Sequence, residues 1–210
     1  MQNVGFLQYA VNMELRERAA GIAMALLRLA RAAEAEAREQ GQAEGLTPAQ
    51  AAVLRFAAKT RPDMATPGQL ARLLGVRPPT AVGIVNPLVE RGLIERRPHP
   101  FDGRQSVLAL TAAGWEAWSR LERWQAGLER TLAALPEAEL AAFEAVLAKV
   151  VAAEVRAGRL VVSAPCAGCI HFRPDAHPGS DRPHHCALID RALGAAEAAM
   201  ECPEHTPAAG

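Results

Sequence analysis

The stretch that decides the fold is TPGQLARLLGVRPPTAVGIVNPLVERGLIERRPHPFDGRQSVLALTAAG, which runs from Thr66 to Gly114. Its first part has the marks of a helix start, because Thr66 and Gln69 have capping-box spacing and Pro67 stands at the first helical position. The apolar face of this helix is formed by Leu70, Ala71, Leu73 and Leu74. Gly75 then predicts a turn.

A second helix is expected to begin near Pro78 and to end at Arg91, because a glycine, Gly92, follows in the C-cap position. Residues 93–97 and 106–110 read as two strands, separated by a short loop rich in proline and glycine. The sequence therefore predicts a helix-turn-helix followed by a β-hairpin, which together make a winged helix.

Three segments of this stretch resemble a known family: GQLARLLGV, PTAVGIVNPLVERGLIER and DGRQSVLALTAAG. They are similar to the helix-turn-helix and wing of the MarR family of bacterial transcription regulators, whose Asp-x-Arg wing tip runs into Leu-x-Leu-Thr-x-x-Gly. The resemblance covers roughly residues 10–156 in the order of elements. It implies a homodimer with interleaved first and last helices, a pseudo-palindromic site on double-stranded DNA, and a crevice for a small-molecule effector.

Composition limits the possible functions. The chain has 210 residues, half of them apolar, and a net charge of zero, so it offers no general attraction to nucleic acid. The basic residues are nevertheless concentrated in the winged helix, where six arginines stand against three acids between residues 66 and 105. No signal peptide or membrane span is indicated, and we expect a cytoplasmic protein. No nucleophile or phosphate-loop motif supports an enzyme.

Long amphipathic helices flank the predicted winged helix. They are expected at about residues 12–40, after Thr47, from Thr111 to residue 135, and at about residues 137–156. Their apolar stripes exceed what one small domain can cover, so we expect a dimer whose core includes Trp115, Trp118 and Trp124. The predicted fold is mainly α, with a MarR-like domain at residues 1–158, its winged helix at about 46–111, and a small metal-stapled module at 159–210.

The candidate DNA-binding residues lie on the second helix and the wing. They are Arg77, Thr80, Asn86, Arg96, Arg97, His99, Asp102 and Arg104. The wing arginines and His99 are expected to contact phosphates or enter a minor groove, while Asp102 orients Arg104 by a charge-assisted hydrogen bond. The resemblance places a base-reading arginine near Val82 and Gly83, and this chain has none there. Pro87 predicts a kink that costs about 3 kcal/mol.

The segment after residue 158 holds all four cysteines of the chain and five of its six histidines. Cys166 and Cys169 form a C-x-x-C pair, and the two isolated cysteines Cys186 and Cys202 follow. Thiols gathered in this way in a cytosolic protein favour a metal site over disulfides. Zinc is the first expectation and a [4Fe–4S] cluster the next, since Pro203 follows the last cysteine; a redox-active dithiol without metal is the third. Histidines 171, 184, 185 and 205 are possible replacements for one thiolate.

The sequence thus predicts a dimeric, DNA-binding transcription regulator that responds to metal or redox state through its four-cysteine site. The response would travel from the last dimer helix to the spacing of the recognition helices. The alternative is a winged-helix protein whose zinc-stapled tail is a structural protein-interaction module. A third possibility is an electron-transfer role.

Overall fold

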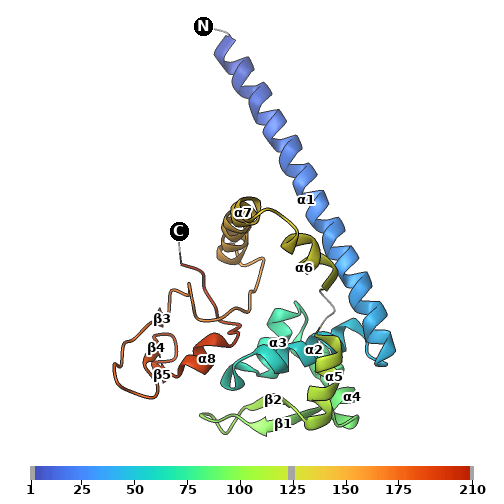
Figure 1. Cartoon of the computed structure of the whole chain (residues 1–210), viewed down its shortest axis with the longest axis vertical. Helices are drawn as coiled ribbons and strands as arrows, with labels where there is room; N and C mark the ends of the chain where they lie inside the picture. The colour runs from blue at the N-terminus through green and yellow to red at the C-terminus, as the bar shows by residue number, and fades with distance from the viewer. Residues whose placement is uncertain (1–2, 123–125, 209–210) are drawn as a thin grey trace.

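A helix of 41 residues, α1 (Asn3–Ala43), leads into the winged helix and projects well beyond it in Figure 1. The computed structural model describes residues 3–122 and 126–208. The predicted first helix is therefore confirmed and extended at both ends. It ends at a turn in which Gly45 takes a positive φ of 62°, a conformation that glycine adopts without steric cost.

The predicted winged helix is present, and its hairpin lies at the lower end of the molecule in Figure 1. The elements are α2 (Pro48–Lys59), the short 3-10 helix η1 (Pro62–Met64), α3 (Pro67–Leu73), α4 (Pro78–Glu90), β1 (Ile94–Pro98), β2 (Ser106–Leu110) and α5 (Ala112–Leu121). The strands pair antiparallel, with Ile94 opposite Leu110 and Pro98 opposite Ser106. Helix α4 runs through Pro87 to Glu90, so the proline does not end it.

The N-terminal caps of α2 and α3 differ in whether the glutamine side chain bonds back to the cap residue. Thr47 forms a complete capping box with Gln50 at the start of α2. Thr66 accepts a hydrogen bond from the backbone of Gln69 at 3.2 Å, but the Gln69 side chain donates to Glu204 at 2.6 Å instead of returning to the cap. The Gln69 side chain therefore bonds the C-terminal segment where a complete capping box would have it bond the backbone of Thr66.

The core of the winged helix joins its helices to the inner face of the hairpin. Phe56, Leu70, Leu88 and Leu108 are at most 2% exposed and belong to one cluster. Trp118 of α5 belongs to the same cluster, so the prediction that it forms the dimer core is wrong. Trp115 is 52% exposed on the other face of α5, and Trp124 lies outside the described residues.

The sequence Leu-Thr-x-x-Gly after the wing has a steric origin. Thr111 caps α5, accepting a hydrogen bond from the Gly114 backbone at 3.0 Å and donating to the Gly92 carbonyl at 2.5 Å. The backbone at Gly114 passes so close to the hairpin that a Cβ atom there would lie 2.0 Å from the Leu93 carbonyl oxygen. Only glycine fits this crossing of α5 and the wing.

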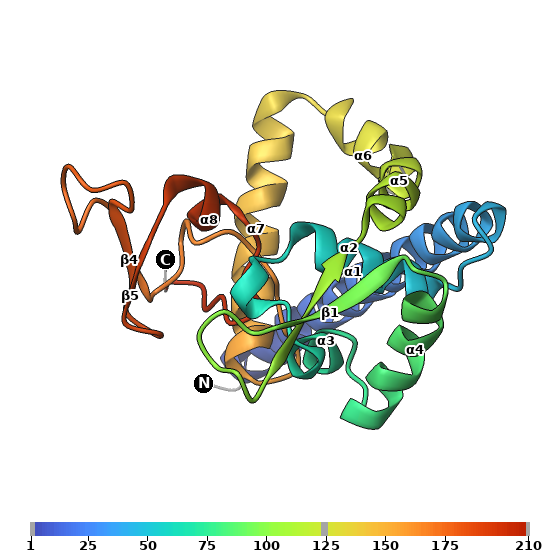
Figure 2. The ribbon, with the colours of Figure 1, turned by 90° about the horizontal axis from the view of Figure 1, so that it is seen from below.

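Two helices, α5 and α6 (Ala126–Ala133), stand in place of the single helix predicted from Thr111 to residue 135, and α7 (Glu137–Arg156) follows them. The bounds predicted for α7 are confirmed. Both helices stand on the same side of the winged helix as α1 in Figure 1, and Figure 2 shows α7 crossing behind α2 and α3. In the described part of the chain no helix is long and apolar enough to cross a membrane.

The C-terminal segment forms a three-stranded antiparallel sheet and a short helix. Its elements are β3 (Phe172–Arg173), β4 (His184–Cys186), β5 (Arg191–Leu193) and α8 (Ala195–Ala199), in sheet order β3-β4-β5. The chain turns before β5, where Asp190 takes a positive φ of 46°, and helix α8 begins only after that strand. The segment lies beside the winged helix (Figures 1 and 2).

Candidate DNA-binding surface and four-cysteine cavity

Helix α4 and the wing together present exposed polar and basic side chains. Arg77 is the N-cap residue of α4, and Thr80 lies in its first turn; both are exposed. Asn86 accepts a hydrogen bond from a terminal nitrogen of Arg96 at 2.7 Å, so α4 and β1 meet through two of the predicted residues. Arg97 pairs with Glu95 on the same strand.

His99 lies at the wing tip, but its ring is directed toward the protein. Its Nδ1 accepts backbone hydrogen bonds from Phe101 at 3.1 Å and Asp102 at 3.0 Å. Its Nε2 must therefore carry the proton, and this N–H donates to the Asp63 carbonyl at 2.8 Å. Both nitrogens hold the wing in place, and contact between His99 and DNA stays a prediction.

Asp102 shapes the tip through the backbone, which corrects the expectation that it holds the Arg104 side chain. Its Oδ1 accepts from the Arg104 backbone N–H at 3.0 Å, and its Oδ2 accepts from the Gln105 side chain at 2.8 Å. The bond from Gln105 and then that from Arg104 lower the pKa of Asp102. The carboxylate thus fixes the turn that leaves the Arg104 side chain exposed.

The structure brings the four predicted cysteine ligands to one small cavity. Cys166, Cys169, Cys186 and Cys202 all line it, and all are free thiols. Its volume of ≈ 10 Å³ is room for about one water molecule. Cys166, Cys186 and Cys202 are at most 8% exposed. Two of the four histidines predicted as alternative ligands, His171 and His205, also line the cavity.

The cavity is assembled from distant parts of the chain. A turn brings the Cys169 N–H to the Cys166 carbonyl at 3.0 Å, and Cys186 lies in β4 opposite Phe172. Cys202 pairs with Ala164 in an isolated bridge. The preceding residue, Glu201, donates to the Lys59 carbonyl and accepts from the Arg61 N–H, both at 2.9 Å. The last cysteine is thereby attached to the end of α2.

These cysteine and histidine side chains can hold a metal ion only if at least three of them lie close enough to bind the same ion. Across residues 3–122 and 126–208, no three His, Cys, Asp or Glu side chains are grouped closely enough to hold a metal ion. Burial raises the pKa of the Cys202 thiol to about 11 and also raises that of Cys166. A metal would have to displace these protons in order to bind. The four cysteines surround a common space without converging on a single point.

The remaining histidines form contacts of their own. His177 Nε2 lies 3.1 Å from His185 Nδ1, and His185 and His184 lie beside Asp190 and Asp175. His205 Nδ1 lies 2.8 Å from the Pro165 carbonyl. Burial lowers the pKa of His205, which keeps its imidazole neutral more readily.

Among the cavity residues that sequence reasoning missed is a buried charge, Arg61. It is 1% exposed, and its Nε donates to Asp63 Oδ1 at 2.7 Å. Burial is the largest single effect and lowers the pKa of Arg61, but the hydrogen bond to Asp63 and the nearby negative charges, of which Asp63 is the strongest, together outweigh it and raise this pKa, so the guanidinium stays charged. Among the residues that the structure describes, the other two guanidinium nitrogens have no hydrogen-bond partner. Nothing in the local sequence sets this arginine apart from the many others of the chain.

Asp63 connects the cavity with the wing. Its Oδ1 accepts the hydrogen bond from Arg61, and its Oδ2 accepts a hydrogen bond from a terminal nitrogen of Arg191 in β5 at 2.9 Å. The Arg191 guanidinium also lies over the Phe101 ring of the wing tip, 4.5 Å from its centroid. Since His99 bonds the Asp63 carbonyl, the C-terminal segment, η1 and the wing tip form one contiguous set of contacts.

Further ion pairs hold the C-terminal segment against the winged helix. Arg55 of α2 forms two hydrogen bonds to Glu201, at 3.2 and 2.7 Å. Arg72 of α3 pairs with Glu204, which also accepts from Gln69. These contacts attach the segment to α2 and α3.

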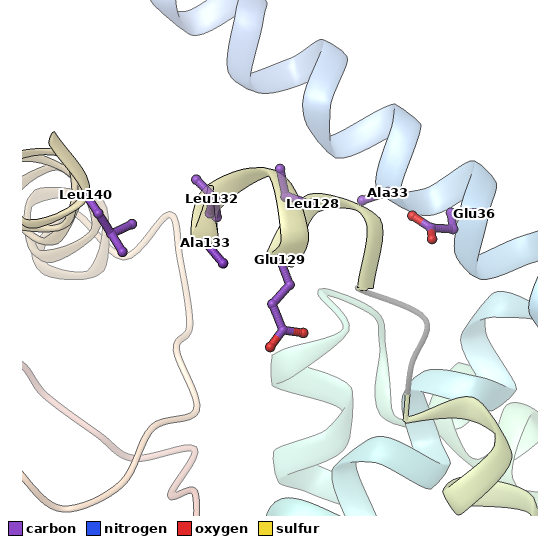
Figure 3. A pocket seen from close by; sticks show the side chains of 7 residues that line it. All are labelled: Ala33, Glu36, Leu128, Glu129, Leu132, Ala133 and Leu140. Atoms are coloured by element: carbon purple, nitrogen blue, oxygen red, sulfur yellow. The ribbon is translucent and has the colours of Figure 1, made fainter. Parts of the chain in front are cut away.

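A second hollow, of ≈ 490 Å³, lies between α1, α6 and α7. Figure 3 shows Leu128 and Leu132 of α6 between Ala33 of α1 and Leu140 of α7. Most of its lining is apolar, with Glu36 at one edge. Such a surface favours covering by another apolar group.

A helix-turn-helix followed by a two-stranded wing defines the winged-helix class. Residues 44–105 match the family model described as MarR family. An HTH-type transcriptional regulator of Mycobacterium tuberculosis (strain CDC 1551 / Oshkosh) is 41% identical over 51 residues, which are 24% of this chain and 36% of that protein. The chain thus spans about a third of the length of the curated relatives it matches.

Two solved structures extend the likeness beyond the winged helix. CouR from Rhodococcus jostii RHA1 bound to p-coumaroyl-CoA has a TM-score of 0.54 and 24% identity, covering 61% of this chain and 90% of CouR. The S. aureus MepR–DNA complex has a TM-score of 0.54 and 21% identity, covering 62% of this chain and 96% of MepR. At these identities the likeness establishes the fold. Residues 44–105 therefore form a winged helix that is similar to those of the MarR family.

Proposed function

We propose that this protein is a dimeric, sequence-specific DNA-binding transcription regulator. The observation that carries the proposal is the MarR-type winged helix whose α4 and wing expose Arg77, Thr80, Asn86 and the wing arginines together. The hydroxyl of Thr80 and the amide of Asn86 are groups that hydrogen-bond to base edges, and the arginines suit phosphates. The MepR structure, in complex with DNA, supports this use of the fold.

The dimer is proposed from the surface of the long helices. Large apolar side chains of α1 and α7 are exposed in the single chain, among them Ile22 at 64% and Val146 at 61%. Monomeric proteins rarely leave such long apolar stripes in water. A twofold partner that packs α1 and α7 against their copies would cover these stripes and the hollow beside α6.

DNA binding is tested with the full-length protein and a pool of random-sequence duplexes. Selection should enrich a pseudo-palindromic sequence. Replacing Arg104 with Ala should weaken binding to all DNA sequences. The slope of the logarithm of the binding constant against the logarithm of the salt concentration should become shallower by about one for each chain, because one phosphate contact is lost. The control is Arg38→Ala, which removes an exposed arginine of α1 outside the winged helix. Unchanged affinity and salt slope in the Arg104 variant would exclude the wing as a DNA contact.

We further propose that the C-terminal segment regulates DNA binding through a metal held by Cys166, Cys169, Cys186 and Cys202. The contacts of Asp63 with Arg61, Arg191 and His99 support a route from the cavity to the wing. This route differs from the one expected from sequence, which ran through the last dimer helix. A coupling of about 1–3 kcal/mol would change operator affinity roughly 5–150-fold.

The regulatory part is tested by measuring operator affinity of the metal-loaded protein before and after metal removal by a chelator. The affinity should change by at least several-fold. Equal affinities in the two states would exclude a sensor and favour the alternative, a structural interaction module, while leaving the DNA-binding proposal standing.

A further inference from the structure

The tip of the wing, residues 99–105, is attached to the C-terminal segment through an aromatic ring. The guanidinium of Arg191, in β5, lies over the ring of Phe101, with 4.5 Å between its central carbon and the ring centroid. The loop between β1 and β2 points toward the C-terminal sheet in Figures 1 and 2. Because the face of an aromatic ring is negative, it attracts a cation placed over it. Arg191 therefore holds the wing tip from outside the winged helix.

Arg191 is itself fixed by two carboxylates from different elements. Its side chain is 17% exposed, and one terminal nitrogen donates to Asp63 Oδ2 at 2.9 Å. The same nitrogen lies 3.7 Å from Glu197 Oε1 of α8. Its backbone is held by the sheet, where Arg191 lies opposite Cys186 of β4. Charged partners of this kind hold a guanidinium in one place, so the contact with the wing has a rigid base.

The backbone of the wing tip depends on the same aspartate. His99 Nε2 donates to the Asp63 carbonyl at 2.8 Å. The other ring nitrogen of His99 accepts hydrogen bonds from the backbone N–H groups of Phe101 and Asp102. Asp63 thus bonds the tip through its carbonyl and bonds Arg191 through its carboxylate. The two attachments order both the backbone and the aromatic ring of the tip.

These attachments hold the tip without covering the arginine proposed to contact DNA. Phe101 remains 62% exposed although the Arg191 guanidinium lies on one face of its ring. Arg104, in the same loop, is exposed as well. A loop that is ordered in the free protein does not have to be ordered by its ligand, and this favours affinity. The contact from the C-terminal segment therefore favours DNA binding and does not block it.

We propose that Arg191 is a positioning residue for DNA binding, which holds the wing tip through Phe101 and Asp63 so that Arg104 reaches the duplex. This inference rests on the DNA binding proposed above and does not depend on a metal at the four cysteines. It adds to that proposal a residue of the C-terminal segment that acts on the wing without touching DNA.

The test measures operator affinity of the full chain with Arg191 replaced by Met, which removes the charge but keeps a long side chain. Affinity should fall at least about fivefold, the lower end of typical couplings between two sites. The matched control is Arg55→Met, because Arg55 also joins the C-terminal segment to the winged helix, but at α2 and through Glu201. Unchanged affinity in Arg191→Met, or equal losses in the two variants, would overturn the proposal.

A double substitution separates positioning from a general loss of stability. In an Arg104→Ala background, Arg191→Met should change affinity by no more than about twofold, because the side chain that Arg191 positions is already gone. A structural role would lower affinity by the same factor in both backgrounds. That result would overturn the assignment of Arg191 as a positioning residue.

Amide hydrogen exchange, followed by NMR, tests the position of the tip without DNA. In Arg191→Met the amides of Phe101 and Asp102 should exchange at least several-fold faster, while the amide of Leu108, which bonds the Ala65 carbonyl at 2.8 Å, should keep its rate. Unchanged exchange at the tip would overturn the proposal.

Should Arg191→Met fail to fold, Phe101→Leu replaces it in each measurement, since it removes the ring from a largely exposed site. The same outcomes then support or overturn the proposal. DNA binding by the unaltered protein is scored separately. If that protein selects no operator, the result counts against the proposed function, and hydrogen exchange at the tip alone decides whether Arg191 positions the wing.

Discussion

At the scale of single residues, glycine decides how the wing meets the helix behind it. We expect Gly114→Ala to destabilise the protein by about 1–3 kcal/mol, because its Cβ would lie 2.0 Å from the Leu93 carbonyl oxygen and 3.2 Å from Leu110 Cδ2. Gly83→Ala in α4 is the control, since its Cβ would meet no atom within 4 Å. There the better helix former should stabilise by about 0.5–1 kcal/mol. Denaturant unfolding measures both.

If Gly114→Ala unfolds at the same denaturant concentration as the unaltered protein, α5 and the wing can move apart to accommodate the Cβ atom with little loss of unfolding free energy. The steric account of the Leu-Thr-x-x-Gly motif would then be wrong.

The residues of the wing tip show what sequence can and cannot supply. Spacing was sufficient to predict that Asp102 and Arg104 belong to one turn. It did not reveal that the carboxylate bonds the Arg104 backbone, or that His99 faces η1, because both contacts depend on the three-dimensional path of the loop. Arg61 was beyond prediction for the same reason: the cysteines with which it lines the cavity lie on a segment more than 100 residues away.

At the scale of elements, the strongly periodic helices could be predicted and their junctions could not. The bounds of α7 and the order of the winged helix followed from apolar spacing and caps. The short strands β3 to β5 carry too few residues for a periodic signal. The separation of α5 from α6 was missed because the apolar spacing continues across it.

An ion pair between elements gives the fold a dependence on pH. Arg120 of α5 donates to both oxygens of Glu44, just after α1, at 2.7 and 2.9 Å. These bonds hold the pKa of Glu44 below its ordinary value of 4.5. A carboxylate whose pKa is lowered by folding adds stability above the unfolded-state pKa, and this contribution is lost as pH falls through the folded-state pKa.

The unfolding free energies of the unaltered protein and of Glu44→Gln should therefore differ at neutral pH and converge in acid. The measurement is a series of denaturant titrations from pH 7 down to pH 3. In an Arg120→Met background, Glu44→Gln should have almost no effect at any pH. A difference that persists at low pH, or that survives loss of Arg120, would assign the effect to another partner.

At the scale of the whole molecule, we expect the apolar surface of the long helices to determine how chains assemble. The unaltered protein should have twice the 22.4 kDa mass of one chain in light scattering. Replacing Ile22 of α1 or Val146 of α7 with Glu should give monomers, because each would place a charge in the proposed interface. Ser119→Glu, on the exposed side of α5, is the control and should stay dimeric.

A monomeric unaltered protein would contradict the twofold model outright. Dimers that persist in both glutamate variants would move the interface away from α1 and α7, and the exposed stripes would then need another covering partner.

The attachment of the C-terminal segment also limits how its role can be studied. Deleting residues 160–210 would expose the buried Arg61 and remove Glu201 and Glu204 from α2 and α3. Such a deletion disturbs the winged helix itself, so a loss of DNA binding would not separate a sensor from a structural module. Single substitutions of the cysteines leave these ion pairs in place and give the cleaner comparison.

The pairing of Glu201 with Lys59 and Arg61 sets an order in time for a newly made chain. Domains generally fold as they leave the ribosome, at about 5–20 residues per second, so synthesis from residue 122 to residue 202 lasts on the order of ten seconds. During that interval all residues of the winged helix have been synthesised, but the segment that buries Arg61 has not. We therefore expect the winged helix of a newly made chain to reach its final structure only after the segment that carries Glu201 and the last cysteine has been made.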